Sequence, residues 1–400
     1  MWFKILLISI FLSSNISLVF SEVVNIYNSK IIDNNNEYCK KNNDKFTDNK
    51  ILLEEINFIT IDADSQRKWF KNLFKATIWH GINTPKKYKK KFKAKIKVNF
   101  KNDIECTFKA KIRIHGDQKD HIQTTMDGNM YSSMHVQLIE DNIDSITKFI
   151  LFIPLTRNAD NEVLTTTLFQ HLNLLAPRTK YIDTYVNGTR IKYLFQEKIT
   201  KEMLENNNFP EGPIIEASHR FLWPNKKTNF IDARLVQARV TNQNWSIKNN
   251  QNIKKTTLAL SKFNEAYIDN RSDFNTNRLA FKNKKAQQTL AEFEAIMSAL
   301  GGFHGLSAHN IKFYYDPTNL TFLPIYYDGD VNILNKNSNS LFYKDFDSKI
   351  SHRAKIGAKS SIQKIKKIDA DDLIKDLKNN GLSLNKKDFL LIKKKLIDAL

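Results

Sequence analysis

FKAKIKVNFKNDIECTFKAKIRI, residues 92–114, contains two runs in which apolar and polar side chains alternate. Alternation with a period of two is typical of a strand that buries one face. Residues 101–103 separate the two runs and predict the turn of a β-hairpin. The second face of this hairpin is basic, and we interpret it as solvent-exposed strand surface, with anion binding as the alternative. It carries Lys93, Lys95, Lys97, Lys109, Lys111 and Arg113.

Further strands and helices are predicted toward the C-terminus. The segments HVQLI, from His135, and FILFIPL, from Phe149, are strand candidates. Asn187-Gly188 separates the alternating segments TKYIDTYV and TRIKYLFQ, and this dipeptide is a strong signal for a hairpin. Apolar residues at helical spacing predict helices over 161–175 and 289–300, and residues 346–400 have the pattern of basic helices. The fold class predicted from these elements is α+β.

The composition excludes several classes of protein. With 41% hydrophobic and 26% charged residues, the 400-residue chain can bury a core, so wholesale disorder is excluded. The presence of two cysteines excludes a disulfide-rich scaffold and a cysteine-rich zinc module. Cys106 lies on the apolar face of the first hairpin, so we expect a buried free thiol rather than a bond to Cys39. The net charge of +20 has no recognition motif behind it, and nucleic acid is not an expected partner.

The amino terminus has the layout of a secretory signal peptide. Lys4 precedes an apolar run that is interrupted by serine and asparagine and ends at the small residue Ser21. This run is short for a membrane span. We expect export to the periplasm, the cell envelope or the medium, with cleavage near Ser21. An uncleaved signal anchor is the alternative, and it would be the only expected contact with a membrane.

A second informative hairpin is predicted between residues 311 and 327, where the strands IKFYY and LTFLPIYY flank the turn DPTN. Antiparallel pairing places the end of the second strand beside the start of the first. Asn310 and Asp328 should therefore be neighbours. An amide oxygen and a carboxylate together suit a hard cation such as Mg²⁺, which takes one or two protein oxygens with water and phosphate. We expect Asn310 and Asp328 to be ligands of this metal.

The segment RIHGDQKDH, Arg113 to His121, gathers two imidazoles and two carboxylates at the end of a strand. Three interpretations remain open for it. It forms a polar turn, since glycine followed by aspartate is ordinary turn chemistry. It contacts phosphate or substrate. Alternatively, it ligates a transition metal, because imidazole with carboxylate suits zinc or iron; the ligands would then be His115, Asp117, Asp120 and His121.

Two glutamates each have a structural and a functional interpretation. Glu162 lies in the first turn of the helix predicted from Asn161, where a carboxylate interacts favourably with the helix dipole. In the functional interpretation it holds Arg113 or Lys111 in place for phosphate, as the helix glutamate of protein kinases does. Glu197 ends the second strand of the Asn-Gly hairpin, and it either faces a pocket or caps the following helix.

These motifs, in this order, resemble those of the CotH family of spore-coat protein kinases and their exported bacterial relatives. The matching segments include KIRIHGDQKDH, KFILFIPLTRNADNE, LLAPRTKYIDTYVNGTRIKYLFQEKITKEMLE and HGLSAHNIKFYYDPTNLTFLPIYYDGD, and the match spans about residues 90–335. The resemblance implies an atypical protein-kinase-like fold with two lobes. The N-terminal lobe would be β-rich, the C-terminal lobe mostly helical, and ATP with Mg²⁺ would bind between them.

The resemblance also assigns roles to residues. Asp328 is similar to the metal-holding aspartate of the family, and Asn310 to the catalytic-loop asparagine. Protein kinases place a catalytic aspartate about five residues before this asparagine, and this chain has Gly305 there. His304 or His309 would then act as the base. The nucleotide-side residues implied by the resemblance are Arg113, Lys111, Glu197 and Glu162.

The expected function is that of an exported CotH-like atypical protein kinase. It would transfer the γ-phosphoryl group of ATP to a Ser, Thr or Tyr hydroxyl of an envelope or coat protein. The first alternative is a catalytically inactive kinase-fold protein that binds a partner or assists coat assembly. The second alternative is a metal-dependent hydrolase. The expected organisation is a signal peptide over 1–21, a polar region over 22–89, the CotH-like domain over 90–345 and a basic helical segment over 346–400.

Overall fold

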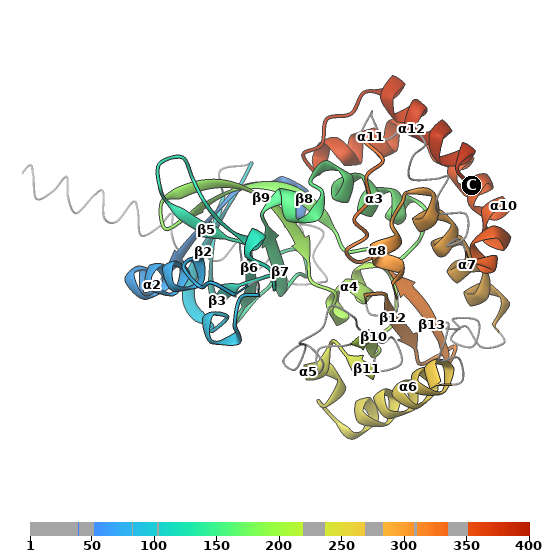
Figure 1. Ribbon diagram of the computed structural model, residues 1–400, viewed down its shortest axis with the longest axis horizontal. Helices are drawn as coiled ribbons and strands as arrows, with labels where there is room; N and C mark the ends of the chain where they lie inside the picture. The colour runs from blue at the N-terminus through green and yellow to red at the C-terminus, as the bar shows by residue number, and fades with distance from the viewer. Residues whose placement is uncertain are drawn as a thin grey trace, which may run out of the picture.

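The computed structural model describes residue 39 and residues 52–81, 83–101, 104–218, 237–268, 283–307, 310–334 and 351–400. The predicted signal peptide and His309 lie outside these residues. Figure 1 shows a β-barrel on one side of the molecule and, on the other, a second sheet with most of the helices. Among the described residues, no helix combines the length and the apolar composition that crossing a bilayer requires.

The barrel closes in the strand order β1-β2-β3-β6-β7-β9-β8. Neighbouring strands are antiparallel except at the closing seam, where β1 pairs in parallel with β8, from Phe58 opposite Asp183 to Ile61 opposite Val186. Its strands are β1 (Ile56–Ala63), β2 (Phe92–Phe100), β3 (Glu105–Ile114), β6 (Met134–Leu138), β7 (Lys148–Phe152), β8 (Thr179–Val186) and β9 (Thr189–Glu197).

Both predicted hairpins of the barrel are confirmed. In the first, Phe92 of β2 lies opposite Ile112 of β3, and the alternating apolar residues fill the barrel interior. In the second, Asn187 and Gly188 have positive φ angles of 47° and 87°, as a tight turn with the twist of its flanking strands requires. Helix α2 (Gln66–Thr77) adds Trp69 and Leu73 to the barrel core. The elements β1 and α2 both fall within the region 22–89.

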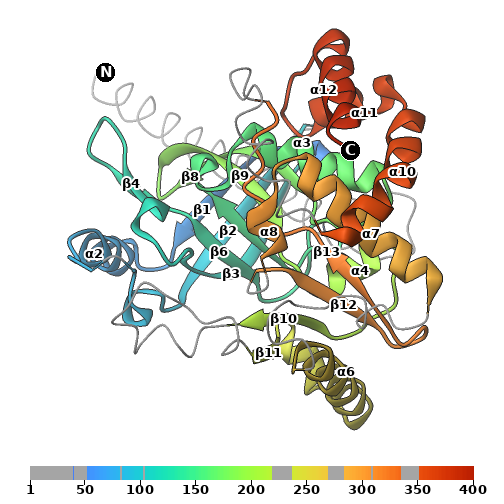
Figure 2. The ribbon, with the colours of Figure 1, turned by 45° about the vertical axis from the view of Figure 1, so that its right-hand side comes forward.

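The second half of the molecule contains a sheet with the strand order β11-β10-β12-β13. Helix α3 (Asp160–His171) lies in the chain between the barrel strands β7 and β8 and packs into the core of this half. Figure 2 shows α8 (Phe303–Leu306), in orange, between the barrel strands and helix α7 (Lys284–Ala299). The predicted hairpin is confirmed, with Lys312 of β12 opposite Ile325 of β13. The strands are β10 (Ile214–Ser218), β11 (Gln237–Val240), β12 (Lys312–Asp316) and β13 (Thr321–Ile325). The helices are α4 (Lys201–Asn206), α5 (Gln243–Ser246), α6 (Asn250–Ile268), α7 (Lys284–Ala299), α8 (Phe303–Leu306), α10 (His352–Lys367), α11 (Ala370–Asn379) and α12 (Lys386–Asp398).

Short elements complete the description. Strands β4 (Ile122–Thr124) and β5 (Met130–Ser132) form a separate two-stranded ribbon. The 3₁₀ turns are η1 (Leu53–Glu55), η2 (Lys86–Tyr88), η3 (Lys119–His121) and η4 (Pro154–Arg157). The predicted helix over 161–175 is confirmed as α3, which ends at His171, and the helix over 289–300 is confirmed as the C-terminal part of α7.

The expected two-lobed kinase fold, with a β-rich N-terminal lobe and a mostly helical C-terminal lobe, is wrong. The N-terminal strands close on themselves into a barrel, because the free edge of β1 pairs with β8. The other half contains many helices, but it also contains a four-stranded sheet with the order β11-β10-β12-β13. The predicted kinase architecture therefore does not agree with these elements.

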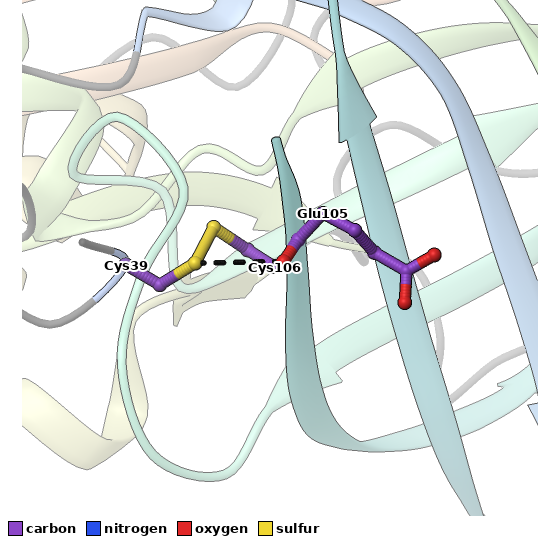
Figure 3. Close-up of a disulfide and its surroundings, with 3 residues drawn as sticks. All are labelled: Cys39, Glu105 and Cys106. Atoms are coloured by element: carbon purple, nitrogen blue, oxygen red, sulfur yellow. Dashed lines mark hydrogen bonds between the residues drawn. A yellow bond between two sulfur atoms is a disulfide. The ribbon is translucent and has the colours of Figure 1, made fainter. Parts of the chain in front are cut away.

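The predicted free thiol at Cys106 is also wrong. Cys106 is fully buried, as expected, but it forms a disulfide with Cys39, and the two Cα atoms are 5.8 Å apart (Figure 3). Cys106 is the second residue of β3 and therefore lies near one end of the barrel. At that position a side chain directed into the barrel remains within reach of a residue that joins the core from outside the strands, as Cys39 does.

Candidate functional site

The centre of the site is Arg157, at the end of η4, where the chain passes from β7 into α3. Its side chain is only 8% exposed and forms an ion pair with Asp328. The guanidinium carbon lies 4.5 Å from the centre of the Phe152 ring and 5.3 Å from that of Tyr327, and one of its nitrogens donates a hydrogen bond of 3.3 Å to the Tyr327 hydroxyl. A second nitrogen, Nε, is buried without a hydrogen-bond partner. Arg157 is therefore held rigidly, with one donor left unused.

Asp328 lies on the loop that follows β13, and this loop is joined to the one that carries Arg157. The amide nitrogen of Asn158 donates to Asp330 Oδ1 at 2.7 Å and to the main-chain oxygen of Val331 at 3.0 Å. Both loops have strained backbone: φ is 52° at Asn158, 50° at Asp328 and 55° at Asp330. Strain of this kind costs about 1–3 kcal/mol per residue and is concentrated at functional sites.

Asn310 and Asp328 are neighbours, as the hairpin predicted. Asn310 Nδ2 donates to the main-chain oxygen of Asp328 at 3.3 Å and to that of His304 at 3.2 Å. The Asp328 carboxylate itself is directed toward Arg157 and His304, whose Nε2 lies 3.6 Å from Asp328 Oδ2. The predicted proximity is therefore present, and the amide and the carboxylate have different immediate partners.

The charges of this cluster shift the pKa values of its members. Burial opposes ionisation of Asp328, but the Arg157 guanidinium and the nearby His304 outweigh burial and hold the pKa of this carboxyl well below its usual range. The contact with the same carboxylate raises the pKa of His304 above its usual 6.5, although partial burial opposes the shift. Asp328 is therefore ionised at neutral pH, and its carboxylate favours the protonated form of His304.

The His304 shift can be measured directly. We expect the ring protons of His304 to titrate with a pKa above 6.5, and Asp328→Asn to lower that pKa, because the carboxylate stabilises the imidazolium. By linkage, this contact contributes stability that is complete below pH 6.5 and is lost as the pH rises through the folded-state pKa. NMR titration would test this, with His304→Gln identifying the resonance among the nine histidines. A pKa unchanged by Asp328→Asn would contradict the assignment.

The segment from Arg113 to His121 packs behind Arg157. The rings of His115 and His121 meet edge to face with centres 5.9 Å apart, and Phe152 lies against both. Gly116 has a positive φ of 90°, and a Cβ atom there would lie 2.0 Å from His121, so only glycine fits. Burial, reinforced by Arg157, lowers the pKa of His115 well below 6.5. The two histidines are therefore uncharged, and they line one side of the site through their packing.

The carboxylates of that segment do not join the histidines in a metal site. Asp117 is 78% exposed on its side chain and pairs with Lys89, and Asp120 is exposed. His121 Nδ1 is 3.0 Å from the Ser133 hydroxyl, which also accepts a hydrogen bond from the Ile153 main chain. Within the described ranges, no group of three His, Cys, Asp or Glu side chains is placed to hold a metal ion.

A strongly basic cavity of about 340 Å³ lies between the barrel and the α4–α5 region. His135 and Trp245 line it, and Glu202 is the one carboxylate among its lining residues. Burial, with Lys198 and Arg113 next in importance, lowers the pKa of His135 to about 2, so this imidazole is neutral. The cations lining the cavity are Lys91, Arg113, Lys148, Lys198, Lys201 and Lys248.

The other three residues with an expected nucleotide role lie elsewhere. Buried Glu162 accepts hydrogen bonds from Gln196 at 2.7 Å and from the Tyr326 hydroxyl at 2.5 Å, so it supports the packing of α3 rather than Arg113 or Lys111. Lys111 is exposed on the outer barrel face, opposite Lys93 in the β2–β3 register.

Glu197, also buried, neither opens onto the cavity nor caps the start of α4. It pairs with Arg178, whose Nε is 3.2 Å from Glu197 Oε2, and accepts a hydrogen bond of 2.7 Å from Asn206 at the end of α4. Of the expected nucleotide-side residues, Arg113 is thus the one that lines the basic cavity.

Sequence reasoning did not single out Arg157, Asp330 or His135. Arg157 stands in the quoted segment KFILFIPLTRNADNE, between a buried strand and a buried helix, where the charge partner of an arginine cannot be identified from the neighbouring residues. Its partner is 171 positions away, so the ion pair became visible only with the tertiary structure. His135 alternates with apolar residues in HVQLI, and only the neighbouring strand brings Arg113 opposite it.

Comparison of the sequence with protein-family models and with curated proteins finds no match. The resemblance to the CotH kinases therefore stays a prediction that rests on the motifs. The site itself consists of two adjoining parts: the loop cluster of Arg157, Asp328 and Asp330, and the basic cavity that contains Arg113.

Proposed function

We propose that this chain is an exported phosphotransferase that binds a nucleoside triphosphate and transfers its γ-phosphoryl group to a hydroxyl of an envelope or coat protein. The observation that carries the proposal is the basic cavity next to an acidic loop. His115 lies between the two parts: it follows Arg113 by two residues, and its ring packs on Phe152, whose ring also lies against Arg157. The phosphate chain of a nucleoside triphosphate needs several basic side chains around it, such as those that line the cavity. Transfer of the γ-phosphoryl group also needs groups that neutralise its negative charge.

The cavity suits phosphate groups in size and charge. Its volume of about 340 Å³ lies within the range of small-ligand sites, about 300–1,000 Å³. Arg113 and Lys198 approach it from the barrel and from the segment after β9, while Lys201 and Lys248 come from α4 and from beyond α5. A ligand there would touch both halves of the molecule. Arg113 would steady the phosphate charge.

The loop cluster suits one hard cation. Asp330 would offer a carboxylate oxygen, and Asp328 would share its carboxylate between the cation and its present partners Arg157 and His304. The amide nitrogen of Asn310 is used in hydrogen bonds, which leaves its oxygen as a further ligand. Mg²⁺ needs only one or two protein oxygens when water and phosphate supply the others. When bound, Mg²⁺ would neutralise phosphate charge. His304, half exposed beside Asp328, would orient or deprotonate the acceptor hydroxyl.

Two further features support export. The N-terminal segment has the pattern of a signal peptide, and the Cys39–Cys106 disulfide is of a kind that persists in oxidising compartments outside the cytosol. The acceptor would then be a protein of the envelope or coat.

One observation favours a second function, that of a non-catalytic binding protein. Gly305 stands where kinases have their catalytic aspartate, and the structure leaves no room for a side chain there. A Cβ atom on Gly305 would lie 2.7 Å from Met297 Cε and 3.0 Å from the main-chain oxygen of Tyr327. On this alternative the cavity would bind its anionic ligand and no phosphoryl group would be transferred.

A thermal-shift titration with ATP, with and without Mg²⁺, tests the proposal. At about 100 times its Kd, ATP should add about 2.7 kcal/mol and raise Tm by about 3 °C, and more with Mg²⁺ than without. Arg113→Gln should remove this shift. The matched control Arg190→Gln, an exposed barrel arginine 3.3 Å from Asp183, should keep it. No shift with the folded wild-type protein would refute the nucleotide site, whereas a shift without radiolabel transfer to any envelope protein would favour the binding protein.

A further inference from the structure

Helix α2 has one face in the barrel core and a second apolar face in solvent. Trp69, Leu73 and Ala76 are buried, and Trp69 packs edge to face on Phe92 with ring centres 5.3 Å apart. On the outer side, three large side chains at spacings of four residues form an apolar ridge. Their exposed fractions are 54% for Phe70, 47% for Phe74 and 53% for Ile78.

Isolated exposed apolar residues are ordinary, but a ridge along one helix is not. Trp79, 37% exposed, extends the ridge past the end of the helix. The inner face already satisfies the packing of α2, so the ridge contributes nothing to the barrel core. Because the helix is anchored through Trp69, the ridge is presented in a fixed orientation before any partner arrives.

The surroundings of the ridge are basic. Residues 64–91 contain nine lysines and arginines and a single carboxylate, Asp64. Lys71 and Lys75 are exposed next to the ridge, and among the described residues neither is paired with a carboxylate. The ammonium of Lys87 lies 4.8 Å from the centre of the Trp79 ring. Exposed apolar side chains and lysines on one helix, with a tryptophan just past its end, form the pattern of a helix that lies in a membrane interface.

We propose that the outer face of α2, with the exposed residues Lys86, Lys87 and Lys90, binds the surface of an anionic phospholipid bilayer. The ridge would enter the boundary between headgroups and acyl chains, and the lysines would contact the phosphates. Charge complementarity identifies the occupant. A protein partner would need many carboxylates placed opposite these lysines, whereas an anionic bilayer has phosphate groups over its whole surface. This contact is separate from the predicted signal segment and does not depend on the proposed phosphotransferase activity.

The position of α2 leaves the functional site accessible. Figure 1 shows α2 at the end of the molecule farthest from α10 and α12, with the barrel between α2 and the second sheet. A bilayer that contacts α2 would therefore face the barrel, and the loop cluster of Arg157 and Asp328 would stay open to a protein acceptor.

Vesicle co-sedimentation of the full chain tests this inference. We expect binding to vesicles of 70% phosphatidylcholine and 30% phosphatidylglycerol, at least tenfold weaker binding to pure phosphatidylcholine, and a marked loss in 0.5 M NaCl. Phe70→Ser with Phe74→Ser should weaken binding to the anionic vesicles at least tenfold. Lys71→Glu with Lys75→Glu should do the same, with a smaller salt dependence in what remains.

The control pair is Ile356→Ser with Leu391→Ser, whose side chains are 64% and 54% exposed on α10 and α12. This pair removes similar apolar surface away from α2 and should leave binding unchanged. Circular dichroism and Tm should be the same for both pairs, because all four side chains are exposed. Equal vesicle binding by the two double variants would overturn the inference and would indicate that the ridge binds a protein.

Discussion

Replacing Asp328 with asparagine should lower the free energy of unfolding by about 3–5 kcal/mol and reduce phosphoryl transfer by at least about a hundredfold. Both effects follow from the ion pair with Arg157, whose side chain is 8% exposed. Without the carboxylate, the buried guanidinium has no counter-charge. This lowers the free energy of unfolding far more than the loss of an exposed ion pair does. The loop cluster also loses its central anion, to which His304 is bound.

A second variant separates the two effects. In Arg157→Met with Asp328→Asn, both members of the buried ion pair are removed, so we expect most of the lost stability to return and the activity to stay absent. Asp183→Asn, which removes an exposed partner 3.3 Å from Arg190, should change stability by less than about 1 kcal/mol. Urea denaturation and radiolabel transfer give the two readouts. Full transfer activity in Asp328→Asn would rule out the proposed role of this residue.

Removing the disulfide should have an effect of similar size on stability. Cys39 and Cys106 are separated by 67 residues, and the loop they close corresponds to about 4 kcal/mol of chain entropy removed from the unfolded state. We expect Cys39→Ala to lower the free energy of unfolding by about 2–4 kcal/mol. Since both sulfurs lie in the barrel core, part of the effect will come from lost packing.

The measurement is urea unfolding of the wild type and the variants, with and without dithiothreitol. Reduction should destabilise the wild type and leave Cys39→Ala unaffected, and the double variant Cys39→Ala with Cys106→Ala should be close to the single one. A wild type whose unfolding midpoint is insensitive to reductant under conditions that break the bond would contradict the expected contribution.

Local structure could be predicted from the sequence wherever its cause is local. The Asn187-Gly188 turn, the β2–β3 hairpin and the β12–β13 hairpin each follow from alternation and turn chemistry within some twenty residues. The end of α7 at Gly301, with φ of 71°, likewise follows from the freedom of glycine. These elements are present where the sequence placed them.

Architecture could not be predicted, because its causes are distant along the chain. Strand β1 was missed although Ile59, Ile61 and Ala63 alternate on its buried face. Its parallel pairing with β8 joins residues that are about 125 positions apart, and nothing in either segment specifies the other. That one pairing turns an open sheet into a barrel, and it is the reason why the kinase-like expectation failed.

For the candidate site, too, contacts with a local cause were predicted and contacts between distant segments were not. The proximity of Asn310 and Asp328 follows from one hairpin and was predicted. The roles expected for Glu162 and Glu197 depend on which neighbour a buried carboxylate meets, and the neighbours are Tyr326, Gln196 and Arg178. Burial decides that a carboxylate must have partners, but it does not decide which ones.

The parallel seam between β1 and β8 also sets the order of events during synthesis. At about 5–20 residues per second, β8 emerges from the ribosome roughly 6–25 s after β1. During that interval β1 and β2 can form a ribbon, but the outer edge of β1 remains without its neighbour, a template for contact with other nascent chains. The nascent protein should therefore depend on a chaperone that shields this edge until β8 has emerged from the ribosome.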